Sequence, residues 1–190
     1  MDEILKIVLN CNKKRMLLSH RDVKRICKII ATNNNYEGCD CEFKIVNLTD
    51  EECGGEVDDS DNHIIFYDEG IDCMINSDYE YMTAYESLDG TKIDFLNFAY
   101  LSVIFHEMAH VRQFKLIKSR NKSMETQLYR ICEKLMNIKE FYDENYTLML
   151  NEVNAFSKGA IDSLSVYKKM PLEYLSQNDR VRYASFTLYN

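Results

Sequence analysis

The residues with the clearest chemical potential are two histidines and a glutamate, in the segment His-Glu-Met-Ala-His at residues 106 to 110. A helix completes one turn in about 3.6 residues, so His106 and His110 would lie one above the other and could bind one metal ion. Imidazole nitrogen suits Zn²⁺. Glu107 would lie about 100° around the helix, off the metal but near a water molecule bound to it. The spacing therefore predicts a zinc-dependent hydrolase in which Glu107 is the general base and later the acid.

This chemistry requires a helix, because two histidines four residues apart also occur as surface pairs or as buried hydrogen-bonded groups. Thr91 and Asp94 form a possible capping box after the turn Asp89-Gly90, and residues 92–117 contain neither Gly nor Pro. They predict one long helix over 92–117, with the motif well inside it. Its expected buried positions recur at three- and four-residue steps: Phe98, Leu101, Phe105, Met108 and Ala109.

A catalytic zinc ion needs about three protein ligands and one position for water. Metzincins extend the motif with a glycine and then a third histidine. Here the corresponding positions hold Gln113 and Leu116, which excludes that arrangement. The remaining histidines, His20 and His63, show no ligand spacing, and we expect them to be ordinary surface or core residues.

Glu152 is the preferred third ligand. It lies on a second expected helix, over about 143–169, which would begin with Asp143 as N-cap and end before Pro171. Three small residues and one phenylalanine share the face of Glu152, so this helix could approach a neighbour closely: Ala155, Phe156, Gly159 and Ser163. An exposed glutamate is the alternative interpretation, and three other glutamates compete as ligands: Glu133, Glu140 and Glu144.

The stretch Val-Ile-Phe-His-Glu-Met-Ala-His-Val-Arg-Gln resembles the active-site helix of gluzincins, the thermolysin-like superfamily of zinc peptidases. Glu152-x-x-Ala155 is similar to their glutamate helix, and the resemblance covers roughly residues 92–165. It implies a zincin-like fold, with His106, His110 and Glu152 as ligands of one Zn²⁺ per chain and Glu107 as base. Two features depart from the family: the gap from His110 to Glu152 (152 − 110 = 42 residues), and Phe156 where thermolysin-like enzymes carry a supporting Asp.

The rest of the chain predicts a compact α+β domain over residues 1–190, mostly helical, with a short sheet preceding the active-site helix. Residues 41–46 and 63–67 alternate or are rich in β-formers, and 71–75 is expected to pair with 63–67. By analogy with gluzincins, one edge strand could pair with an extended peptide. Residues 23–30 are expected to be helical, and the asparagines at 33–35 to end that helix.

Between the two motifs, Ser123 could open a further helix. Its apolar positions are more typical of a core face than of a binding surface: Leu128, Ile131, Leu135 and Ile138. The acidic run 50–61 is expected to be a solvated loop, although it could attract a basic substrate.

Composition limits the possible partners. The net charge of −8 and a pI of about 5.1, without a basic stripe, argue against nucleic-acid binding. No apolar run suits a signal peptide or a membrane span, and seven cysteines without framework spacing suit a reducing cytoplasm; export by a pathway without such a signal stays open. Cys39, Cys41 and Cys53 could bind a second metal, but their spacing is not that of a zinc finger.

Three functions stay open from sequence. The leading one is a zinc metallopeptidase acting on a peptide or protein substrate. A zinc amide hydrolase with a non-protein substrate would use the same chemistry. A non-catalytic, metal-binding regulatory protein is the third, although a structural zinc site would not need Glu107 and would normally have a fourth ligand.

Overall fold

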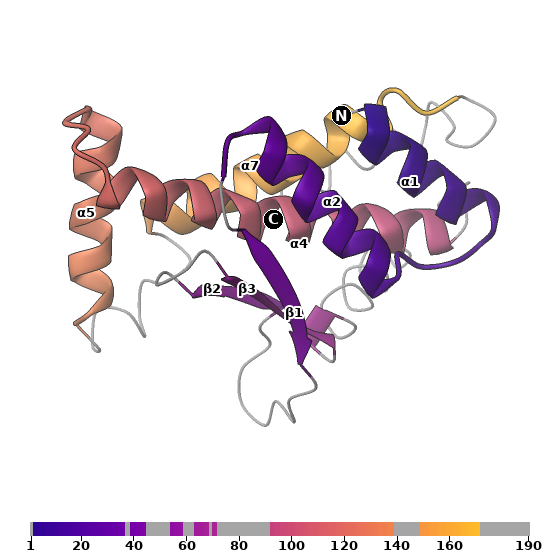
Figure 1. Cartoon of the computed structure of the whole chain (residues 1–190), viewed down its shortest axis with the longest axis horizontal. Coiled ribbons are helices and arrows are strands. Elements are labelled where there is room, and N and C mark those ends of the chain that lie inside the picture. Colours follow the sequence, from indigo (N-terminus) through magenta and orange to yellow (C-terminus); the bar gives the residue numbers. More distant parts are fainter. Residues whose placement is uncertain are drawn as a thin grey trace, which may run out of the picture.

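The computed structural model describes residues 2–36, 39–44, 54–58, 63–68, 70–71, 92–138 and 149–171, and shows a mostly helical α+β fold. A long helix crosses the middle of the molecule, the sheet lies below it in the view of Figure 1, and another helix stands across one end. The helices are α1 (Asp2–Lys13), α2 (His20–Asn33), α4 (Lys92–Lys118), α5 (Met124–Met136) and α7 (Leu150–Tyr167). The strands are β1 (Asp40–Lys44), β2 (Gly55–Asp58) and β3 (His63–Tyr67).

Helix α4 is the centre of the fold, and the predicted helix over 92–117 is confirmed. All five of its positions expected to be buried are buried. A helix that is apolar around most of its circumference must be covered on most sides, and α4 contacts α1, α2, α5, α7 and β2. The predicted cap Thr91 lies outside the described residues. Within the described residues, no helix combines the length and apolar composition needed to cross a bilayer.

The sheet has the strand order β1-β3-β2, with β1 parallel and β2 antiparallel to β3. Strand β3 confirms the prediction for 63–67, and β1 confirms it for the described part of 41–46. The expected pairing of 71–75 with β3 is wrong at Ile71, which is helical, and the rest of that segment lies outside the described residues.

The acidic run 50–61 is not a loop throughout, because Gly55–Asp58 forms β2. Its sequence Gly-Glu-Val-Asp contains one apolar side chain, so the strand has little β-propensity of its own. Pairing with the buried strand β3 supplies the order that its own composition lacks, with Val57 opposite Ile64. The rest of the run lies outside the described residues.

Helix α2 begins at a capping box in which the Ser19 hydroxyl accepts from the Asp22 backbone N–H and the Asp22 carboxylate accepts from the Ser19 backbone. It contains the predicted helix 23–30 and ends at Asn33. Asn35 then takes a φ of 55°, a left-handed conformation that asparagine tolerates better than most residues. The predicted break at 33–35 is therefore confirmed.

Helix α5 confirms the helix predicted after Ser123, but its apolar face is not core. Leu128, Ile131 and Ile138 are 40%, 51% and 50% exposed. The buried positions are Thr126, Tyr129 and Cys132. Polar contacts set this rotation: Arg112 of α4 pairs with Glu125 over 2.9 Å, and Arg130 donates to the carbonyl groups of Ile117 and Ser119 at the end of α4.

Helix α7 begins at Leu150 with Met149 as N-cap, later than the start predicted at about 143, and Asp143 lies outside the described residues. It ends at Tyr167, before Pro171 as expected. The Tyr167 hydroxyl donates to the Asp94 carbonyl oxygen over 2.9 Å, so the C-terminal end of α7 is joined to the first turn of α4. The two helices therefore run side by side along the site described below.

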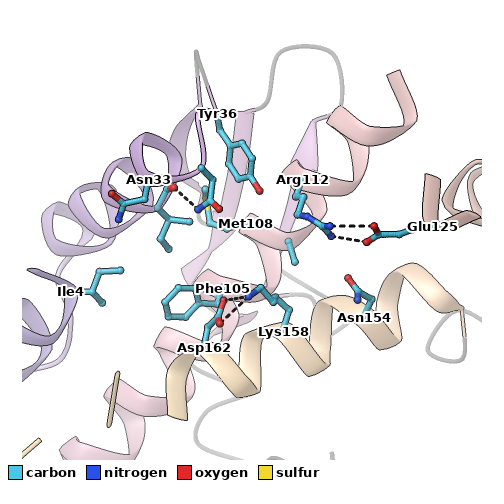
Figure 2. A pocket seen from close by; sticks show the side chains of 13 residues that line it. Ile4, Asn33, Tyr36, Phe105, Met108, Arg112, Glu125, Asn154, Lys158 and Asp162 are labelled. Carbon is cyan, nitrogen blue, oxygen red and sulfur yellow. Dashed lines mark hydrogen bonds and ion pairs between the residues drawn. The ribbon is translucent and has the colours of Figure 1, made fainter. Parts of the chain in front are cut away.

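A cavity of about 660 Å³ lies where α1, α2, α4 and α7 leave space between them (Figure 2). Phe105 and Met108 of α4 supply apolar walls, and Arg112 with Glu125 forms an ion pair at one side. Asn154 of α7, which accepts a hydrogen bond from Gln113 over 3.3 Å, also lines the cavity.

The close packing of α4 and α7 can be tested by adding a methyl group at Gly159. A Cβ atom on Gly159 would lie 2.6 Å from the Ser102 carbonyl oxygen and 3.3 Å from the His106 backbone nitrogen. Alanine in an unobstructed helix interior is more stable than glycine by about 1 kcal/mol. We expect Gly159→Ala to lower the free energy of unfolding instead, by about 1–3 kcal/mol, because the helices must separate. Urea denaturation measures this, and Ser157→Ala on the exposed face of α7 is the control, expected to be neutral or stabilising.

Candidate metal centre

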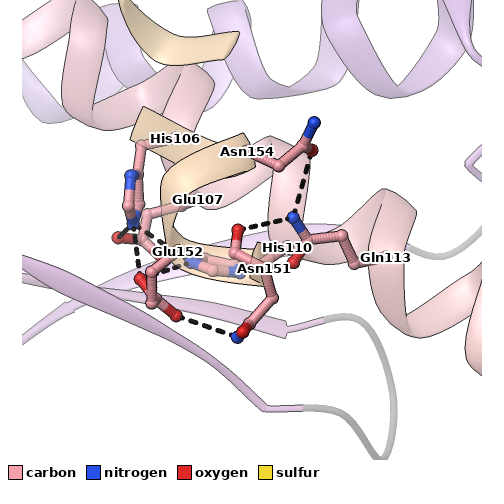
Figure 3. A network of polar contacts seen from close by, with 7 residues as sticks. All are labelled: His106, Glu107, His110, Gln113, Asn151, Glu152 and Asn154. Atoms are coloured by element: carbon pink, nitrogen blue, oxygen red, sulfur yellow. Dashed lines mark hydrogen bonds and ion pairs between the residues drawn. The ribbon is translucent and has the colours of Figure 1, made fainter. Parts of the chain in front are cut away.

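Three side chains from two helices converge at one point (Figure 3). His106 and His110 come from α4 and Glu152 from α7, and their ligand atoms all lie within 4.8 Å of one another. The two Nε2 atoms are 3.0 Å apart, and Glu152 Oε2 lies 3.6 Å from His106 Nε2 and 3.4 Å from His110 Nε2. The structure thus brings together the three residues that the sequence nominated as ligands.

The close approach of α7 to α4 makes this convergence possible. Ala155, Gly159 and Ser163 are buried on the face of α7 that carries Glu152, as the sequence predicted. Gly159 lies so close to the Ser102 carbonyl that a methyl group would not fit. Glu152 lies in the first turn of α7, where its carboxylate reaches the two histidines.

The donor atoms suit a divalent cation. Glu152 is only 2% exposed, and within the described part of the chain its Oε2 atom faces the two histidines, 3.4 Å from His110 Nε2 and 3.6 Å from His106 Nε2. A buried carboxylate is costly unless it is well paired, and a cation bound between it and the histidines would lower that cost. Two imidazole nitrogens and one carboxylate oxygen form the donor set of a catalytic zinc site.

The two histidines differ in protonation. Burial, together with the neighbouring charge of His110, lowers the pKa of His106 to about 3. Burial also disfavours the charged form of His110, but the hydrogen bond and charge of Glu152, the charge of Glu107 and the hydrogen bond with Gln113 outweigh it and raise the pKa of His110 to about 9. Without a metal, His106 is therefore neutral and His110 carries a proton, which a bound cation would displace.

Glu107 lies beside the cluster and is not one of its three members. It is 4% exposed, and its Oε1 atom is 4.0 Å from His106 Nε2. Burial raises the pKa of Glu107 to about 7, with the charge of His110 opposing this rise and those of Glu152 and Glu56 adding to it. Gly55 of β2 packs against its side chain, since a Cβ atom there would lie 3.1 Å from Glu107 Cδ.

A network of side-chain amides supports the cluster from behind (Figure 3). The Gln113 side chain lies 2.9 Å from His110 Nδ1 and donates to the Asn151 carbonyl oxygen over 2.8 Å and to Asn154 Oδ1 over 3.3 Å. Asn151 in turn donates to Glu152 Oε1 over 3.1 Å. From sequence, Gln113 served only to exclude the metzincin pattern. The sequence does indicate this role, because Gln113 follows His110 by three residues and so lies on the same face of an apolar helix.

Phe156 occupies the position beside His106. The two rings lie 4.4 Å apart with an interplanar angle of 58°, and Phe156 is 41% exposed. His106 Nδ1 is buried and has no hydrogen-bond partner within the described part of the chain. Apolar packing therefore holds His106, whereas hydrogen bonding holds His110.

Other sequence candidates lie elsewhere. His20 pairs with Asp68 over 2.8 Å, and His63 lies 3.5 Å from a Glu42 carboxylate oxygen, so neither histidine joins the cluster. Glu133 on α5 is also outside it, and Glu140 and Glu144 are outside the described residues. Cys39 and Cys41 are free thiols that form no metal cluster among the described residues, and Cys53 is not described.

Comparison with known proteins gives no match: no family model, no curated protein and no solved structure matches this chain. What the site can do follows from its own atoms. It combines a cation-binding donor set with a buried glutamate that is free of that set.

Metal content tests the cluster directly. We expect purified protein loaded with zinc to hold about one Zn²⁺ per chain, and His106→Ala and Glu152→Ala to lose it, because each removes one of about three ligands. Elemental analysis after dialysis measures this. Glu133→Ala, which removes a glutamate outside the cluster, should keep its zinc. Full zinc content in His106→Ala would show that the ion binds elsewhere.

Proposed function

We propose that the protein is a zinc-dependent metallopeptidase of the gluzincin type, with a zincin-like arrangement of its active-site and glutamate helices. One observation carries the proposal: His106, His110 and Glu152 converge within 4.8 Å while Glu107, one residue along α4, is buried beside them and outside the ligand set. A structural metal site has no use for such a glutamate. The resemblance of the two motifs to gluzincins supports the same assignment.

Zinc, when bound at this cluster, would polarise a water molecule and a substrate carbonyl group. Glu107 would take the proton of that water as its oxygen attacks the carbonyl carbon, and would then pass the proton to the leaving nitrogen. Its burial in a mostly apolar wall keeps other water away from this transfer. His106 and His110 would hold the ion through their Nε2 atoms, and Glu152 through Oε2.

Strand β2 would position the substrate. It is an edge strand of the described sheet, and Gly55 brings it against Glu107. An extended peptide pairing with such a strand would be held through its main chain, which tolerates many sequences. Its scissile carbonyl would then pass beside Glu107. Glu56 and Asp58 are exposed on the same strand, which favours peptides with basic side chains.

Glu107→Gln tests the proposed role of the base. The amide has nearly the same shape but cannot take a proton, so cleavage should fall by roughly 10²- to 10⁴-fold while zinc content stays unchanged. Cleavage of an unbiased peptide library by zinc-loaded protein, followed by mass spectrometry, measures this. Equal activity in the variant would exclude Glu107 as base. A wild-type protein that binds zinc but cuts no peptide would favour a non-protein amide substrate or a binding role.

Gly55→Ala tests the contact between strand and base. The added methyl group would lie 3.0 Å from the Ile65 carbonyl oxygen and 3.1 Å from Glu107 Cγ and Cδ, so β2 or Glu107 must shift. Small misplacements of a catalytic group are costly, and we expect turnover to fall about tenfold with zinc content unchanged. Val57→Ala, which removes atoms from the same strand, is the control and should affect stability more than turnover. Unchanged turnover in Gly55→Ala would separate β2 from the reaction.

A further inference from the structure

We propose that Gln113 is the positioning residue of this site: it fixes the His110 ring and joins the metal helix to the glutamate helix. The proposal rests on the metal site proposed above. Gln113 lies on α4 and is 2% exposed. Its side chain contacts His110 of the same helix and the backbone of α7, the helix that supplies Glu152. Among the described residues, no other side chain forms hydrogen bonds both to a histidine of the cluster and to α7.

The hydrogen bonds determine the orientation of the Gln113 amide. The Asn151 backbone carbonyl can only accept, so the atom facing it over 2.8 Å must be the amide nitrogen. The Gln113 oxygen therefore faces His110 Nδ1 over 2.9 Å, and that nitrogen must carry a hydrogen. His110 thus directs Nε2 toward His106 and Glu152, with its ring plane set by the hydrogen bond. This is the tautomer that a metal ligand bound through Nε2 requires.

The same amide positions the third ligand. Gln113 Nε2 binds the carbonyl of Asn151, the residue before Glu152, and also Asn154 Oδ1 one turn further along α7. The Asn151 side chain donates to Glu152 Oε1, which leaves Oε2 directed at the histidines. A shift of α7 along α4 would break these hydrogen bonds and at the same time move the Glu152 carboxylate away from the two histidines.

The two histidines are supported unequally, which makes His110 the ring to test. His106 packs against Phe156 and its Nδ1 has no hydrogen-bond partner among the described residues. No amide or carboxylate there performs the role that Gln113 performs for His110. Loss of Gln113 would leave His110 Nδ1 without its acceptor in a buried region and would remove the side-chain bond to α7, so the ring would be free to turn.

Asn97 provides a matched control on the same helix. It is fully buried, accepts from the Leu18 backbone N–H over 2.8 Å, and donates to Asn12 Oδ1 over 2.7 Å and to the Met16 carbonyl over 3.0 Å. Like Gln113 it is a buried amide whose three hydrogen bonds join α4 to another part of the chain. Its partners belong to α1 and the segment after it, not to the cluster.

The experiment compares zinc affinity, measured by competition with a chromophoric chelator, in wild type, Gln113→Leu, Gln113→Glu and Asn97→Leu. We expect Gln113→Leu to bind zinc roughly 10- to 100-fold more weakly, as loss of a ligand's supporting partner does. Gln113→Glu keeps an oxygen opposite His110 Nδ1 and should recover part of that loss. Asn97→Leu should stay within about threefold of wild type, although its stability falls as far as that of Gln113→Leu.

Nitrogen-15 NMR of His110 adds a readout that a merely structural role would not move. With zinc bound at Nε2, the Nδ1–H signal should be present in wild type and should shift when Gln113→Glu replaces the amide acceptor by a carboxylate. If Gln113→Leu does not fold, this shift and the zinc affinity of Gln113→Glu still test whether Gln113 orients His110. An unchanged His110 signal in Gln113→Glu overturns the proposal.

The outcomes separate the two proposals. A wild-type protein without zinc affinity would overturn the metal site itself. Zinc binding that is tight in wild type and equally tight in Gln113→Leu would overturn only the role of Gln113. An equal loss in Asn97→Leu would also overturn it, because general destabilisation would then explain both variants.

Discussion

The site depends on one close contact, between the backbones of α4 and α7. Gly159 lies against the Ser102 carbonyl, and Ala155 and Ser163 continue the same small-residue face. Because side chains are nearly absent at this contact, the Glu152 carboxylate, about two turns before Gly159, falls within 3.6 Å of both histidines. A bulkier residue at Gly159 would move Glu152 of α7 relative to His106 and His110 of α4. The geometry of the cluster is therefore set by packing before any metal binds.

Helix α4 also shows that a polar side chain on a buried helix is placed where it can form hydrogen bonds. Each buried polar side chain must find a partner, since an unpaired one costs about 1–3 kcal/mol. Asn97 meets this requirement by binding the chain around residues 12–18, and Gln113 by binding α7. His106 Nδ1 does not meet it among the described residues. Glu152 Oε2 of α7 faces the Nε2 atoms of the two histidines, as expected where a bound ligand would complete the structure.

The sequence allowed much of this to be predicted where periodicity was strong. The spacing of His106, Glu107 and His110 and the apolar repeat around them fixed α4, and the small residues after Glu152 identified the helix that must approach it. Strand β2 could not be predicted, because its order comes from pairing with β3 and not from its own composition. The predicted buried face of α5 was wrong because the Arg112–Glu125 salt bridge and the Arg130 bonds to carbonyl groups at the end of α4 turn its apolar stripe outward.

The two histidines of the cluster are supported by different kinds of side chain. His106 packs against the aromatic ring of Phe156, and its Nδ1 has no hydrogen-bond partner among the described residues. A neutral amide on α4 itself, Gln113, holds the other histidine. An amide can donate to α7 and accept from His110 at once, which a carboxylate cannot do in its ionised form. The site thus needs no further buried negative charge beside Glu107 and Glu152, and the helix-to-helix link and the ring orientation come from the same side chain.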